Sequence, residues 1–157
     1  MLLRETLLLR LLGLTKIPFL LAIRPRVLKL DEEGCVVVVP LSYFTSNHVG
    51  SMYFGALAAG ADCAGGLNAA RVIYGVRTTA HRGVVPIFKS LHAEFLKLAD
   101  GDVTFRCDQG REIEDAVRQA DRTGERVTLP VRVVASTARH DVARFELALS
   151  LKRKANR

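Results

Sequence analysis

The stretch from Gly55 to Leu67 constrains the fold of this chain more than any other part of the sequence. It consists almost entirely of alanine, glycine and leucine, with no β-branched residue and a single charged one. A helix that is apolar on all sides is a buried helix, and glycines cost it about 1 kcal/mol each relative to alanine, so tertiary packing has to hold it. The sequence therefore predicts one buried helix from about Asn47 to Arg71, whose first turns, ending at Asp62, form the working site.

The composition is that of a globular protein. The chain has 157 residues, of which 49% are hydrophobic and 25% charged, which suits one domain with a real core and argues against disorder. We expect a single domain over residues 1–157. It divides into an N-terminal helix and linker (1–23), a core (24–152) and a basic tail (153–157).

The charge and the cysteines limit the partners. A net charge of +7 attracts anions, but the basic residues are spread along the chain and no aromatic side chains alternate with them, so we expect no nucleic-acid binding. The three cysteines, Cys35, Cys63 and Cys107, form neither a C-x-x-C pair nor a zinc spacing. Free thiols in a reducing, cytoplasmic setting fit this pattern best.

The first 23 residues are rich in leucine but carry four charged residues. Pro18 would break a helix that spans a membrane. We expect an amphipathic helix from Leu2 to about Leu14, ended by Gly13 and then Pro18, that packs on the domain. No stable membrane insertion is expected, and contact with a membrane surface is the alternative.

The other segments predict an antiparallel sheet. Residues 26–40 resemble a hairpin around the turn Asp31–Gly34, and the valine run after it predicts a strand buried on both faces. Further strands are expected at 85–98, 103–107, 126–136 and 142–151, with a short surface helix at 111–122. The expected fold class is α+β: about six strands wrapped around one long central helix.

The segment before and within the long helix resembles the active-site segment of hotdog-fold thioesterases, most closely the phenylacetyl-CoA thioesterase-like branch. Four residues fall at the family's spacings: Asn47, Gly50, Gly55 and Asp62. Tyr53 and Phe54 stand where the family has a histidine and its first glycine. Residues 88–99 resemble the family's long central strand and its exit, and the resemblance covers about residues 24–152. It implies the hotdog fold.

The resemblance also implies a chemistry. The backbone N–H of Phe54, with that of Gly55 beside it, would form an oxyanion hole at the helix N-terminus, where N–H groups are unpaired and the helix dipole is positive. Asp62, about two turns further on the same face, would act as general base or as nucleophile. Asn47 would hold the carbonyl or the water. In the family these Asp and Asn residues come from opposing subunits, so a homodimer is implied, with a dimer of dimers as an alternative.

Each of these residues also has a purely structural interpretation. Asp62 could be a buried carboxylate held by backbone N–H groups or an arginine. Asn47 could be a helix cap or a turn residue, and Gly55 could serve close packing. His48, which is expected to contact the substrate, could instead be a hydrogen-bonding residue of the loop. Tyr53 could replace the family histidine as a hydroxyl donor or lie in the core.

Substrate recognition is expected to involve basic residues. Arg77, Arg82 and Lys89 could meet the phosphates of coenzyme A, or form solvated surface. His92 and His140 lie on strands or a turn without a ligand set, so no metal is expected.

We therefore predict an enzyme that hydrolyses an acyl thioester of coenzyme A or of an acyl carrier, with no cofactor beyond that substrate. The alternative is a non-catalytic hotdog protein that binds an acyl thioester or fatty ligand. A hotdog dehydratase or isomerase is disfavoured because the family's histidine-containing pattern is absent. The chain contains no G-x-S-x-G, H-E-x-x-H, P-loop or G-x-G-x-x-G motif.

Overall fold

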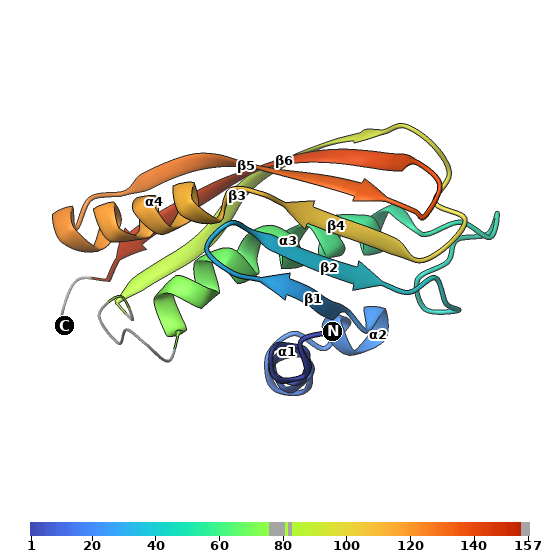
Figure 1. The fold of residues 1–157 in the computed structure, drawn as a ribbon, viewed down its shortest axis with the longest axis horizontal. Coiled ribbons are helices and arrows are strands. Elements are labelled where there is room, and N and C mark those ends of the chain that lie inside the picture. Colours follow the sequence, from blue (N-terminus) through green and yellow to red (C-terminus); the bar gives the residue numbers. More distant parts are fainter. Residues whose placement is uncertain (76–80, 82, 155–157) are drawn as a thin grey trace.

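A six-stranded antiparallel sheet curls along one long helix, α3, in the computed structural model, which describes residues 1–75, 81 and 83–154 (Figure 1). The strands lie in the order β1-β2-β4-β5-β6-β3. Their bounds are β1 Arg26–Leu30, β2 Cys35–Val39, β3 Val84–Phe95, β4 Val103–Cys107, β5 Val127–Ser136 and β6 Asp141–Arg153. The predicted α+β class, the hairpin and the later strands are confirmed.

The sheet and α3 enclose the hydrophobic core. All five residues of β2 are buried, as its valine run predicts. The helix α4, Gly110–Thr123, covers the far end of α3 and buries Ile113 and Val117, so the predicted surface helix is also confirmed.

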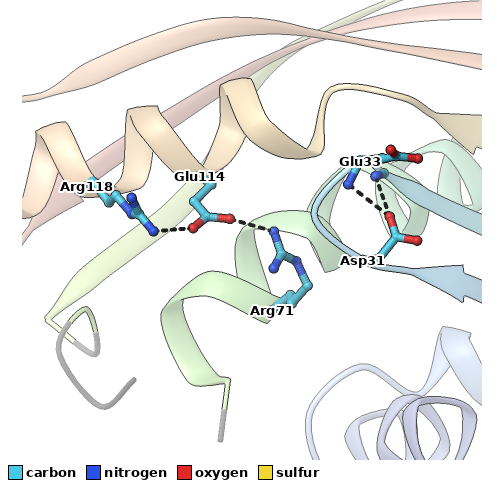
Figure 2. Close-up of polar contacts among 6 residues, drawn as sticks. Asp31, Glu33, Arg71, Glu114 and Arg118 are labelled. Atoms are coloured by element: carbon cyan, nitrogen blue, oxygen red, sulfur yellow. Dashed lines mark hydrogen bonds and ion pairs between the residues drawn. The ribbon is translucent and has the colours of Figure 1, made fainter. Parts of the chain in front are cut away.

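Ion pairs fix the ends of these elements (Figure 2). The Arg71 guanidinium of α3 donates to the Glu114 carboxylate of α4 at 2.9 Å, and the same carboxylate also pairs with Arg118. At the β1–β2 turn, the Asp31 carboxylate accepts hydrogen bonds from the backbone N–H groups of Glu33 and Gly34 at 2.9 and 3.1 Å. The turn predicted from the sequence is therefore held by its own aspartate.

The central helix α3 spans Phe54–Tyr74, so its existence was predicted correctly and its start was not. Residues 47–53 form a loop. The Asn47 side-chain oxygen accepts hydrogen bonds from the backbone N–H groups of Val49 and Ser51 at 3.0 and 3.2 Å. Gly50, with φ of 79°, completes that turn in a conformation that a helix does not allow.

Small residues bring α3 close to the sheet. A Cβ on Gly60 would lie 2.3 Å from the Phe105 ring of β4, and one on Gly65 would lie 3.0 Å from the Val131 side chain of β5. These glycines are therefore required by packing, as the composition of the helix predicts.

Burial of α3 on all sides, however, is wrong for this chain. Asp62 is exposed and Phe54 is 60% exposed, because the sheet curls over only part of the helix.

The N-terminal helix has the predicted extent but not the predicted amphipathic face. Helix α1 runs over Leu3–Thr15, within one residue of the expected bounds, and Gly13 faces the next helix, α2 (Phe19–Ile23), where a Cβ would lie 3.2 Å from the Leu20 Cβ. Only Thr6, Leu9 and Gly13 of α1 are buried, so its leucines do not form the single inward face of an amphipathic helix.

Two hydrogen bonds fix α1 to the edge strand β1. The Leu2 N–H donates to the Val27 carbonyl at 2.7 Å, and the Val27 N–H donates to the Thr6 hydroxyl at 3.0 Å. Within the described residues, no helix has the length and apolar character needed to cross a membrane.

Candidate active site

The N-terminus of α3 is formed by backbone contacts rather than by a capping side chain. Tyr53, the N-cap residue, is extended, and its N–H donates to the Thr45 carbonyl at 2.7 Å. Its carbonyl accepts from the N–H groups of Ala56 and Leu57 at 2.9 and 3.1 Å. These hydrogen bonds fix the position of the first turn of α3 relative to the preceding loop.

The N–H groups of Phe54 and Gly55 have no hydrogen-bond partner among the described residues. Unpaired N–H groups at a helix start, reinforced by the helix dipole, are suited to bind a carbonyl oxygen that gains negative charge. They are the two donors that the resemblance selects.

The Tyr53 ring lies against Gly55. A Cβ on Gly55 would lie 2.6 Å from the Tyr53 Cε1 atom. The Tyr53 and Phe54 rings meet at a centroid distance of 4.6 Å, and both side chains are exposed. Tyr53 is thus at the surface of this chain and not in its core, next to the free N–H groups.

Asp62 lies about two turns along the same helix. Its side chain is exposed in this chain, and desolvation of the carboxyl by the surrounding protein still raises its pKa above the ordinary value of 3.8. Among the described residues it accepts no hydrogen bond and forms no ion pair. A structural role as a carboxylate held by an arginine therefore finds no support in these contacts.

Asn47 and His48 lie in the loop before α3. Besides the two N–H groups that its oxygen accepts, the Asn47 amide donates to the Ser51 hydroxyl at 3.0 Å, so Asn47 shapes a turn in this chain. His48 is exposed in the same turn. The catalytic and binding roles inferred for these two residues stay predictions.

The edge strand β3 lies beside the exposed side of α3. The Phe88 ring would be 3.4 Å from a Cβ on Gly65 and 3.7 Å from one on Gly66. Leu91 and Phe95 pair with Leu147 and Ala143 of β6.

Paired residues point to the same side of a sheet, and both β6 residues face the core. Leu91 and Phe95 therefore point toward the α3 side, yet they are 44% and 53% exposed. We call Phe54, Asp62, Leu91 and Phe95 the open face.

The predicted phosphate-binding residues are only partly placed. Lys89 is exposed on β3, at the irregularity between Phe88 and Leu91. Arg77 and Arg82 lie outside the described residues.

The cysteines add no reactive group to the open face. The three cysteines are free and buried, and burial raises the pKa of Cys63, next to Asp62, to about 12. Over the described ranges, no three His, Cys, Asp or Glu side chains gather in a way that could hold a metal ion. Sequence reasoning did not single out Leu91 and Phe95, because alternation along a strand does not reveal that the strand lies at an edge.

Solved structures share the fold of this protein over most of the chain. A Pseudomonas aeruginosa protein described as a probable thioesterase is 24% identical, with a TM-score of 0.75, over 95% of this chain and 96% of its own. A Haemophilus influenzae thioesterase is 15% identical, with a TM-score of 0.64, over 91% of this chain and 88% of its own. A variant of the phenylacetic acid degradation protein of Thermus thermophilus is 20% identical, with a TM-score of 0.60, over 85% of this chain and 97% of its own.

These similarities define a hotdog-fold protein, and the resemblance to the hotdog thioesterase superfamily is confirmed at the level of the fold. A family model described as a domain of unknown function, DUF4442, matches residues 6–151. The chain belongs to that family. No curated protein matches it in sequence.

Proposed function

We propose that this protein hydrolyses acyl thioesters, with acyl-coenzyme A as the substrate class and no further cofactor. One observation carries the proposal: the helix that begins with two unpaired N–H groups, those of Phe54 and Gly55, also presents Asp62 at the surface two turns later. The likeness in fold to proteins described as thioesterases supports it.

The reaction follows from these groups. The thioester carbonyl oxygen accepts the N–H groups of Phe54 and Gly55, which stabilise the negative charge that develops during attack. Asp62 removes a proton from a water molecule, and that water adds to the carbonyl carbon. The carbon–sulfur bond then breaks, and the thiolate leaves and takes up a proton, giving a carboxylic acid and a free thiol. Attack by Asp62 itself, through a mixed anhydride, is the alternative route.

We propose that a second copy of the chain completes the site. The edge strand β3 is 12 residues long and exposes Ile87, Leu91 and Phe95. Among the described residues it pairs only with β6. A long, apolar, uncovered edge readily pairs with another chain. Antiparallel pairing of two β3 strands would cover this edge and bring Asn47 of one copy toward Asp62 of the other, as the resemblance implies.

The open face suits the two ends of the substrate. Leu91, Phe95 and Phe54 offer apolar surface to an acyl chain. Lys89, with Arg77 and Arg82, would supply positive charge to the phosphates of coenzyme A.

A protein that binds acyl thioesters without hydrolysis is the second candidate. The contact of the exposed Tyr53 and Phe54 rings beside Gly55 favours it, because these rings stand next to the donors that an oxyanion needs.

The decisive experiment measures thiol release from acyl-coenzyme A substrates of graded chain length. We expect turnover by the natural chain and a loss of about 100-fold or more in kcat for Asp62→Asn, because a positioned general base contributes on that scale. Asp115→Asn, an exposed carboxylate on α4, is the matched control and should leave kcat unchanged. Because the pKa of Asp62 is raised, kcat should fall with acidification at a higher pH than an ordinary aspartate would give.

The candidates separate clearly. Tight binding of acyl-coenzyme A without turnover at any chain length would establish the binding protein instead. A mixture of Asp62→Asn and Asn47→Ala chains should regain activity if the two residues act across a dimer, because some mixed dimers then hold one intact site. No recovery in verified mixed dimers would place both residues in one subunit or remove Asn47 from the reaction.

A further inference from the structure

Helix α1 is held by one narrow side and exposes the rest. Its buried residues are Thr6, Leu9 and Gly13, which face β1 and α2. The hydrogen bonds of Leu2 and Thr6 with Val27 fix this orientation. The outward side of α1 is therefore a defined surface of the folded domain.

Most of that surface is leucine, with the exposed Arg4 and Thr15 among the leucines. One row runs along the helix at intervals of four, four and three residues, with exposed fractions of 71%, 68%, 55% and 71% for Leu3, Leu7, Leu11 and Leu14. At about 100° per residue, these four side chains share one stripe, and Leu8 and Leu12 extend it around about half of the helix. We call these six residues the leucine face.

The apolar surface continues beyond α1. Ile17, Phe19 and Leu21, in the connection and in α2, are 44%, 46% and 41% exposed. Monomeric proteins rarely expose so many adjacent large apolar side chains unless the surface binds something.

The charges in and beside the leucine face are mostly positive. Arg4 projects from within this face, between Leu11 and Leu8, and Arg10 lies at its edge beside Leu3. Lys16 follows the end of α1, whereas Glu5 is the only acidic residue of the helix. In the part of the chain that the structure describes, none of these three cations takes part in an ion pair.

The charges on α1 indicate which kind of partner binds the leucine face. A second copy docked through the same face would bring Arg4 and Arg10 close to their own counterparts, with one glutamate per copy to offset them. A membrane with anionic lipid head groups over an apolar interior matches this combination of leucines and arginines. Arginine side chains can lie along apolar groups while their guanidinium groups reach the lipid phosphates. A broad, convex leucine face also fits a deformable lipid layer better than a shaped groove.

The length of α1 limits how it can meet a bilayer. Its 13 residues extend about 20 Å, which is less than the roughly 30 Å of the hydrocarbon layer. The helix can therefore lie in the interface but cannot cross it.

We propose that the leucine face of α1 binds reversibly to the surface of membranes that contain anionic lipids. This interaction is independent of the proposed hydrolysis. It would hold the domain at the lipid surface by its β1 side, on the opposite edge of the sheet from β3.

Flotation of the full chain with lipid vesicles tests the proposal. We expect binding to vesicles of equal parts phosphatidylcholine and phosphatidylglycerol, weaker binding to phosphatidylcholine alone, and loss of the difference at high salt. Leu7→Gln should lower the partition constant about fivefold, since one leucine loses its apolar contact. Leu98→Gln is the matched control, because Leu98 is 67% exposed, against 68% for Leu7, and lies far along the chain from α1.

The charge contribution has its own pair of variants. Arg4→Gln with Arg10→Gln should weaken binding to the anionic vesicles by about thirtyfold. Arg132→Gln with Arg144→Gln removes the same charge from exposed residues of β5 and β6 and should have a much smaller effect.

Circular dichroism verifies that each variant is folded. No flotation of the natural chain, equal binding to neutral and anionic vesicles, or equal losses in the two leucine variants would overturn the proposal. A change in molar mass of the lipid-free protein on Leu7→Gln, without a change in flotation, would show that another copy covers the leucine face.

Discussion

The two sides of α3 place opposite demands on one small-residue helix. On the packed side, glycines admit the Phe105 ring and the Val131 side chain into near contact with the helix backbone. On the open side, Phe54 and Asp62 are exposed and the neighbouring strand leaves apolar groups uncovered. Packing on one side holds the helix in place. The other side leaves the N–H groups of Phe54 and Gly55 without partners among the described residues and carries Asp62, a carboxylate of raised pKa.

The largest expected difference between the sides concerns two phenylalanines. Phe105→Ala should lower the free energy of unfolding by about 3–5 kcal/mol, because Phe105 is fully buried and its removal leaves a cavity. Phe54→Ala, at the open side, should change it by less than about 0.5 kcal/mol, because the ring is 60% exposed. Urea denaturation of both variants measures this, and a similar loss for both would mean that the open side is covered in solution.

A smaller difference is expected for two glycines of the helix. Gly60→Ala should destabilise the protein by about 1–3 kcal/mol, because its Cβ would overlap the Phe105 ring. Gly66→Ala should instead stabilise it by up to about 1 kcal/mol, because the nearest atom lies 3.7 Å away and alanine favours the helix. Thermal melts report the signs, and destabilisation by Gly66→Ala would show that a further chain approaches the helix there.

The smallest expected effect is that of the Asp62 charge on the stability of the folded chain. The folded-state pKa of Asp62 is raised, so the folded chain binds its proton more tightly than the unfolded chain does. Stability associated with this group is therefore present below the ordinary pKa of 3.8 and decreases as pH rises through the raised value.

Asp62→Asn should consequently raise the melting temperature slightly at neutral pH, and the gain should vanish in acid. The matched Asp115→Asn variant should show no such gain. A lower melting temperature for Asp62→Asn at neutral pH would mean that the carboxylate is stabilised by a partner in solution.

Local patterns were sufficient for most of the fold. The valine run of β2, the Asp31–Gly34 turn and the alternation of β5 and β6 each carry their own signal, because strand burial and turn geometry depend on neighbouring residues. The central helix was predictable from its alanines and glycines, and its link with the hotdog fold came from the resemblance.

The errors share a physical cause. The start of α3 depends on how Asn47 hydrogen-bonds in its turn, and the exposure of the α1 leucines depends on which side of α1 packs on β1 and α2. The open face depends on β3 being the last strand of the sheet. Each is set by tertiary contacts between segments that sequence periodicity does not relate. Asp62 could be singled out from sequence because it is the one charge in the apolar stretch from Gly55 to Leu67. Its exposure could not be predicted.

The hydrogen bonds of Val27 have a consequence for how such sheets can be joined. At the β1 edge, Leu2 and Thr6 of the N-terminal segment already occupy the carbonyl and N–H of Val27, whereas the β3 edge has no such cover among the described residues. Because the β1 edge is covered at Val27 and the β3 edge is not, another chain can extend this sheet only at β3. Edge-to-edge growth would therefore stop after a single joining event, and the fold is protected against forming an open-ended fibre.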